Sequence, residues 1–161
     1  MSKEKYALCP QCDSPLEYHC RVIRPLKNAA GEKNNYSIRV LKCCNEACPR
    51  KYHRELPDII IPYKRHDAAT IEEAIEKEEK DMAVEADFST VSRWKSWFAK
   101  EQTYIMMSLV GVAIALGYDV DLTLLMGIPT IQIIKRLVNR GTGWLQEAAR
   151  ILVNSARWKT G

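Results

Sequence analysis

Two groups of cysteines constrain the fold of this chain more than any other feature of its sequence. Cys9 and Cys12 enclose the dipeptide Pro-Gln, and Cys43, Cys44 and Cys48 follow one another within a short segment. Thiolates are soft ligands, and tetrahedral zinc binds four of them at about 2.3 Å. A Cys-x2-Cys turn supplies two ligands, and Cys48 with either Cys43 or Cys44 supplies the other two. The spacing therefore predicts one zinc site built from two distant parts of the chain.

The segment between the cysteine groups has the pattern of a β-hairpin. LEYHCRVIRPL (16–26) contains strand-forming residues, KNAAGEKNN (27–35) has turn chemistry, and YSIRVLKC (36–43) alternates polar and apolar side chains. A hairpin between two metal-binding turns is the plan of a zinc ribbon. A module of this size cannot bury enough apolar surface by itself, which favours a metal over a set of unmetallated core cysteines.

Cys43 is the preferred third ligand because it directly ends the predicted strand, with Cys44 as the alternative. His53 is a lesser candidate, and His19 and Cys20 are expected to be packing or surface residues. A catalytic zinc needs an open coordination position and usually has His or carboxylate ligands. The thiolate set therefore predicts a structural zinc ion, and no catalytic one.

Positive charge is concentrated in the same part of the chain. Residues 21–66 hold eleven Lys/Arg against four Asp/Glu, whereas residues 71–87 hold eight Asp/Glu against two Lys. Clusters of Lys and Arg attract phosphates and release their counterions. A basic surface without a fixed partner is the alternative. The candidate phosphate-binding residues of the ribbon are Arg39, Arg50, Lys51 and Arg54.

Beyond residue 63 the pattern becomes helical. Asp67 is a good N-cap for a helix, and Asp87 can cap another that begins at Phe88 or Ser89. A short helix expected over residues 80–85 would complete a helix-turn-helix with the helix after Asp87.

That helix has an apolar stripe of Val91, Trp94 and Phe98, which an ordinary packed helical hairpin also explains. Its other faces carry small hydroxyl and basic side chains, which suit a helix in the major groove of DNA. The candidate DNA-binding residues on it are Ser89, Thr90, Ser92, Arg93, Lys95 and Ser96.

The C-terminal part is predicted to be helical throughout. YIMMSLVGVAIALGY (104–118) is too short an apolar stretch to span a membrane, so a buried core helix is expected there. Pro129 and Gly141 are a natural helix start and stop. Residues 142–158 form a further amphipathic pattern, with Trp144 and Trp158 expected to anchor its packing.

The predicted fold class is α+β, with a small N-terminal zinc-ribbon β module followed by an all-helical domain that contains a helix-turn-helix. The expected divisions are residues 1–63 for the ribbon, 64–102 for the helix-turn-helix region and 103–161 for a C-terminal helical bundle. A chain of 161 residues, 47% of them hydrophobic, is large enough for one compact domain or two small ones.

Several segments together resemble a bacterial family of unknown function. The most specific are RELPDIIIPYKR, STVSRWKSWF and the closing VNSARW, and the matching cysteines are Cys9, Cys12, Cys43 and Cys48. Members of that family look like zinc-ribbon proteins with a helix-turn-helix and are often loosely described as transposase-related or mobile-element proteins. The extra Cys44 and the Ser-rich recognition helix depart from the family pattern. The resemblance implies architecture more than biochemistry.

The leading hypothesis is a DNA-binding protein that acts as a regulator or accessory factor of a mobile genetic element. Its expected cofactor is structural Zn2+. Its expected partners are double-stranded DNA and a transposase or other mobile-element protein, and no membrane interaction is expected. No complete catalytic constellation is evident, so an enzyme is not expected. The N-terminal sequence lacks the apolar segment of a secretory signal, so export is not expected. The expected location is the cytoplasm of a bacterium, in association with the nucleoid.

Two alternatives remain. In the first, the protein is an adaptor whose zinc ribbon and C-terminal helices dock a partner enzyme without reading DNA. In the second, lesser one, the ribbon binds RNA, for which stacking requires aromatic side chains. The candidates for stacking are Tyr36, Tyr52 and Tyr63.

Overall fold

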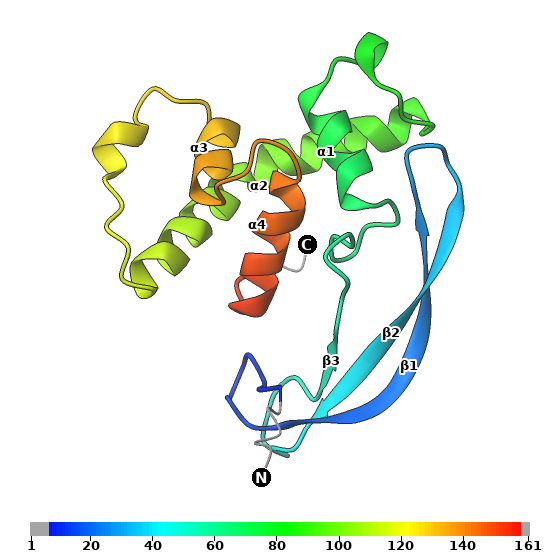
Figure 1. Cartoon of the computed structure of the whole chain (residues 1–161), viewed down its shortest axis with the longest axis vertical. Helices are drawn as coiled ribbons and strands as arrows, with labels where there is room; N and C mark the ends of the chain where they lie inside the picture. Colours follow the sequence, from blue (N-terminus) through cyan, green and yellow to red (C-terminus); the bar gives the residue numbers. More distant parts are fainter. Residues whose placement is uncertain (1–6, 159–161) are drawn as a thin grey trace.

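The computed structural model describes residues 7–158 and has an α+β architecture, which confirms the predicted fold class. A three-stranded antiparallel sheet comes first in the chain, and four α-helices come after it and lie together beside the sheet (Figure 1). The strands lie in the order β1-β2-β3, and their bounds are Leu16–Lys27 for β1, Lys33–Cys43 for β2 and Tyr52–Arg54 for β3.

The predicted hairpin is present as β1 and β2. Their register runs from Leu16 opposite Cys43 to Lys27 opposite Lys33, with one irregularity between Tyr18 and Cys20. This pairing brings the start of β1 beside the end of β2. As a result, the segments that contain the two cysteine groups meet at one end of the sheet.

The other end of the hairpin is attached to the helical part of the molecule (Figure 1). Lys27 exchanges backbone hydrogen bonds with the segment before α1, donating to Arg65 and accepting from Asp67, each at 2.9 Å. The backbone N–H of Glu85 donates to Ala29 in the turn at 2.7 Å. The metal-binding end of the sheet therefore lies one strand length away from the segments that hold the turn, and a fully extended strand of twelve residues measures roughly 36–40 Å.

The rest of the described chain contains four α-helices. Their bounds are Ala68–Glu76 for α1, Phe88–Ala115 for α2, Thr130–Leu137 for α3 and Trp144–Asn154 for α4. Both predicted N-caps are confirmed, because Asp67 accepts from the backbone N–H of Thr70 at 2.8 Å and Asp87 from that of Thr90 at 2.9 Å.

Two predictions about helices were wrong. The short helix expected over residues 80–85 is a single 3-10 turn, η1 (Glu79–Asp81), and an extended segment follows it. Met82, Val84 and Ala86 pack against the helical core, and this alternation along the chain is the period of extended backbone. The structure therefore does not contain the predicted helix-turn-helix pair at this position.

The apolar stretch at residues 104–118 is not a separate buried helix. Residues 104–115 form the second half of α2, which runs for 28 residues without a break at residue 102, and residues 116–118 lie beyond the end of that helix. Ile105, Leu109 and Val110 are buried, but Ile114 and Leu116 are exposed. A second 3-10 turn, η2 (Leu122–Leu125), follows this exposed end.

One hydrophobic core joins the helices. Val91, Trp94 and Phe98 are buried on one face of α2, as their spacing predicts. Trp144 at the start of α4 is completely buried, and its ring centroid lies 5.4 Å from that of Phe98. The predicted anchoring role of Trp144 is thus confirmed.

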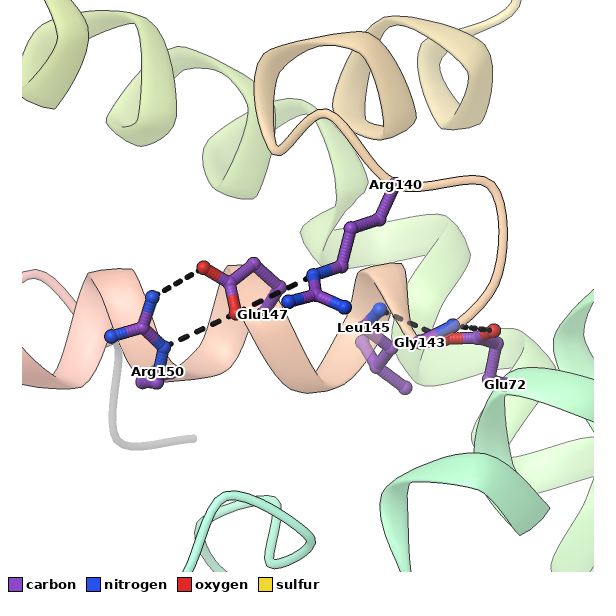
Figure 2. Close-up of polar contacts among 6 residues, drawn as sticks. All are labelled: Glu72, Arg140, Gly143, Leu145, Glu147 and Arg150. Atoms are coloured by element: carbon purple, nitrogen blue, oxygen red, sulfur yellow. Dashed lines mark hydrogen bonds and ion pairs between the residues drawn. The ribbon is translucent and has the colours of Figure 1, made fainter.

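Two residues of the acidic segment hold α1, α3 and α4 together. Glu72 accepts hydrogen bonds from the backbone N–H groups of Gly143 at 2.7 Å and of Leu145 at 2.9 Å, at the start of α4 (Figure 2). Its carboxylate takes the place of a side-chain cap, which Gly143 cannot provide. Glu76 accepts from the indole of Trp144 and pairs with Lys135 of α3 at 2.7 Å.

Candidate metal centre

Four cysteine sulfur atoms gather at the end of the sheet opposite the hairpin turn. The Sγ atoms of Cys9, Cys12, Cys43 and Cys48 all lie within 4.8 Å of one another. Cys9 and Cys48 are 3.8 Å apart at sulfur, and Cys12 and Cys43 are 3.5 Å apart. A tetrahedron with metal–sulfur bonds of about 2.3 Å has sulfur–sulfur edges of about 3.8 Å. The four sulfur atoms thus have the spacing that one tetrahedral metal ion requires.

The first pair of sulfur atoms is positioned by a tight turn. The backbone N–H of Cys9 donates to Ser14 at 2.9 Å, and that of Asp13 donates to Cys9 at 2.8 Å. Asp13 has φ of 56°, in the left-handed region that Asp tolerates better than most residues. This conformation turns the chain back on itself, so that Cys9 and Cys12 face the same point.

The second pair is positioned by the end of β2 and the turn after it. Cys43 donates its backbone N–H to Lys51 at 2.7 Å, and Cys48 donates to Asn45 at 3.1 Å. The side-chain oxygen of Asn45 also accepts from the N–H of Ala47 at 3.0 Å. These bonds close the loop between Cys43 and Cys48 around the sulfur cluster.

The structure brings Cys43, and not Cys44, into this group. Cys43 is buried like Cys9 and Cys48 and belongs to the cluster, whereas Cys44 is exposed. Successive residues at the end of a strand point to opposite faces, so only one of the two can face Cys12. The backbone N–H of Cys44 instead donates to Pro15 at 3.1 Å, which ties the two turns together.

His53 borders the cluster without being part of it. Its Nε2 atom lies 3.3 Å from the sulfur of Cys9, within hydrogen-bonding distance. A ring that hydrogen-bonds a metal-binding thiolate orients it and adjusts its basicity. His19 packs its ring against Tyr52 at a centroid distance of 4.9 Å, in agreement with its predicted packing role.

The thiols of the cluster differ in acidity. Hydrogen bonds with Ser14 lower the pKa of Cys12 to about 6, whereas desolvation raises the pKa of Cys43 to about 12. Four thiolates so close together repel one another unless a cation neutralises them. A divalent ion would supply that charge and displace the remaining thiol protons on binding.

The predicted DNA-binding residues fall into two groups, one in the half of the sheet next to the sulfur cluster and one beside the hairpin turn. Arg50, Lys51 and Arg54 are exposed near the sulfur cluster, and Arg39 pairs there with Glu55 at 3.2 Å. The other group lies on the first turns of α2, whose start adjoins the hairpin turn. Its members are Ser89, Ser92, Arg93 and Ser96, which are exposed, and Thr90 and Lys95, which are half-buried.

Two side chains of the α2 group already have partners within the chain. Arg93 donates to the backbone oxygen of Ser89 at 3.1 Å and to the hydroxyl of Thr90 at 3.2 Å. The amino group of Lys95 donates to the backbone oxygen of Lys77 at 2.8 Å. Contacts of these two residues with DNA would therefore replace existing hydrogen bonds.

Reasoning from the sequence missed a cleft of about 960 Å³ between the sheet and the C-terminal end of α4. Arg24 and Tyr63 line it together with Arg54. Strand alternation places Arg24 on one face of the hairpin, but the sequence contains no signal that α4 lies opposite that face.

The fold and the sulfur cluster define the class of this molecule: it is an α+β protein with a candidate four-cysteine metal centre. Within the described range, 7–158, no helix combines the length and apolar character needed to cross a membrane. The chain belongs to a family described as a domain of unknown function, DUF6431, whose model matches residues 9–94, just over half of the chain. The match includes all four clustered cysteines and ends at Trp94 in α2. Neither the curated proteins nor the solved structures include a match.

Proposed function

We propose that this protein binds double-stranded DNA and that a structural zinc ion in the four-cysteine centre holds its basic surface in shape. The observation that carries this proposal is the set of free cations beside the cluster. Among the residues described, Arg50, Lys51 and Arg54 have no ion-pair partner. Unpaired cations on a rigid scaffold suit a polyanion, because each phosphate contact releases condensed counterions.

The distribution of carboxylates supports this assignment. Glu72, Glu73 and Glu76 are engaged within the helical part, where they cap α4 or pair with lysines. Their negative charge therefore does not neutralise the ribbon. The ribbon end therefore remains basic, whereas these three carboxylates have partners within the helical part.

The distance between the two groups of candidate DNA-binding residues also supports it. From the hairpin turn, Arg50 and Lys51 lie the length of β2 away, at most about 37 Å along eleven residues, whereas Arg39 and Arg54 lie only roughly halfway along it. One turn of B-DNA measures roughly 34–36 Å. Arg50 and Lys51 would thus contact phosphates about one helical turn from the start of α2. In this arrangement the ribbon binds phosphates, and Ser89, Ser92 and Arg93 approach base edges.

Zinc is the proposed metal because of the donor set. A tetrahedral cluster of four thiolates is typical of zinc or of an iron–sulfur site. Four cysteine ligands leave no open coordination position, which suits a structural ion and binding instead of catalysis. The further proposal of a regulator or accessory factor of a mobile element rests on the resemblance of the sequence alone.

A specific observation favours the adaptor as a second candidate function. The segment after α2 exposes large apolar side chains, which are usually covered in a folded protein. Leu116 is 70% exposed, Leu124 71% and Met126 80%. An adaptor would use this end of the molecule to contact another protein.

Two substitutions separate phosphate contacts from base contacts. Lys51→Gln is expected to weaken binding to every duplex alike and to reduce the salt slope by about one. Arg93→Ala is expected to relax the sequence preference by about 1–3 kcal/mol, because it removes a side chain that can reach base edges. Fluorescence anisotropy with a selected and a random duplex, across a range of salt concentrations, measures both effects.

Lys80→Gln is the matched control for Lys51→Gln. Lys80 is an exposed lysine of η1 that lies outside both groups of candidate DNA-binding residues and pairs with Glu78 at 2.9 Å. The Lys80→Gln substitution is expected to leave the affinity for DNA unchanged. Equal effects of the two lysine substitutions, or no binding of duplex at low salt, would count against the proposed function.

A further inference from the structure

The cleft between the sheet and α4 combines cationic and aromatic side chains. It has a volume of about 960 Å³, and its walls come from the sheet, the segment after β3 and the C-terminal end of α4. Figure 1 shows that end of α4 approaching the sheet. The side chains that give the cleft its character are Arg24, Arg50, Arg54, Tyr52, Tyr63 and Trp158.

The sheet register places two of these arginines on the same face. Arg54 lies opposite Val40, which in turn lies opposite Cys20 on β1. Directly opposed residues share a face, and so do residues two or four apart on one strand. Arg24 is four residues from Cys20, and its guanidinium donates to the backbone oxygen of Lys64 at 2.9 Å. Arg24 and Arg54 thus enter the cleft from the same side.

Within residues 7–158, the two arginines that enter the cleft are not matched by ion pairs. Neither Arg24 nor Arg54 forms an ion pair with a residue in the described part of the chain. Glu55 is the acidic residue among the described lining residues, and it pairs with Arg39. Burial and the charge of Arg54 both lower the pKa of Arg24. An anion between the two guanidinium groups would relieve their repulsion.

Two of the three aromatic side chains of the cleft, Tyr63 and Tyr52, are exposed, whereas Trp158 packs against Trp97 of the helical core. Tyr63 is 61% exposed and has φ of 64°, a conformation that bulky residues rarely adopt. Tyr52, the first residue of β3, is 50% exposed. Nucleobases stack on such rings, and arginines along the same groove bind the phosphates between them.

We infer that this cleft binds a short single-stranded segment of nucleic acid, with phosphates at Arg24 and Arg54 and a base stacked on Tyr63. Its volume is near the upper end of the roughly 300–1,000 Å³ found for small-molecule sites, which suits a few nucleotides and excludes a duplex. The inference deepens the proposed function, on which it rests for nucleic acid as the ligand class. It adds a second strand form, and the cleft shares Arg50 and Arg54 with the proposed duplex contacts.

The test compares strand forms and matched variants of the full-length, zinc-loaded protein. Fluorescence anisotropy is measured with a labelled single strand and with the duplex of the same sequence. Arg54→Gln and Tyr63→Leu are each expected to weaken single-strand binding about tenfold, the effect of losing a charge-assisted contact or a stacked base. Tyr63→Leu is expected to leave duplex binding within about twofold of the unmodified protein, because a duplex does not reach the ring.

Arg21→Gln is the matched control, since it removes the same charge from an exposed position on β1 outside the cleft. It is expected to weaken single-strand binding less than about threefold, through its charge alone. Circular dichroism shows whether each variant is folded. If Arg54→Gln does not fold, the result for Tyr63→Leu decides the test.

The outcomes separate the inference from the proposed function. If Arg54→Gln and Tyr63→Leu affect single strands no more than Arg21→Gln does, the cleft is not the site. Binding of duplex without any binding of single strands overturns the inference and leaves the proposed function intact. Binding of single strands that depends on Tyr63, without binding of duplex, supports the cleft and overturns the proposed function. If neither strand form binds, both are overturned.

Discussion

Cys43→Ser is expected to abolish stable metal binding and to unfold the end of the sheet that contains the sulfur cluster. The sulfur of Cys43 lies 3.5 Å from that of Cys12, and the four sulfur atoms have the spacing of a single metal site. Loss of a residue that merely supports a ligand typically lowers metal affinity about 10–100-fold, so loss of a ligand should exceed 100-fold. Titration with a competing chelator measures the affinity, and circular dichroism follows the loss of strand structure.

Cys44→Ser provides a control at the adjacent position. The substitution has the same chemistry, but Cys44 is exposed and lies outside the cluster. It is expected to retain the metal affinity and the strand structure of the unmodified protein. Loss of metal from Cys44→Ser, combined with retention by Cys43→Ser, would show that the alternative ligand is the correct one.

Glu72→Ala is expected to lower the free energy of unfolding by about 3 kcal/mol, because two hydrogen bonds to a charged group are lost at once. Its carboxylate accepts from Gly143 and Leu145 at the start of α4 (Figure 2). Leu145 is completely buried, so water does not readily replace the carboxylate at its N–H. Thermal unfolding should show a decrease in Tm of roughly 6–12 °C for a chain of this length.

Glu78→Ala is the comparison for Glu72→Ala. Glu78 belongs to the same acidic segment, but it is exposed and pairs only with the exposed Lys80 among the contacts described. Its loss should change the free energy of unfolding by less than about 0.5 kcal/mol. If the two substitutions lower Tm equally, Glu72 contributes no more than a surface charge.

The features that could be predicted from the sequence depend on neighbouring residues. The hairpin follows from strand-forming residues on both sides of a turn with Gly31, whose φ is 74°. Asp67 and Asp87 identify helix starts because a cap bonds within its own first turn. The Cys-x2-Cys turn likewise brings two sulfur atoms together over a few residues.

The features that could not be predicted depend on distant residues. Glu72 is 71 residues from Gly143 in sequence, and no local pattern connects a carboxylate on α1 with the start of α4. Arg24 and Trp158 line one cleft, although they belong to opposite ends of the chain. The extended segment with Met82 and Val84 was mistaken for a helix because its alternation is short and its composition favours helix.

The central claim of this account is that four cysteines of one chain hold one metal ion. X-ray absorption spectroscopy of the purified protein, together with elemental analysis, tests it most directly. We expect one zinc ion per chain with four sulfur neighbours at about 2.3 Å. A chain without bound metal, or a zinc ion coordinated mainly by nitrogen and oxygen atoms, would contradict it.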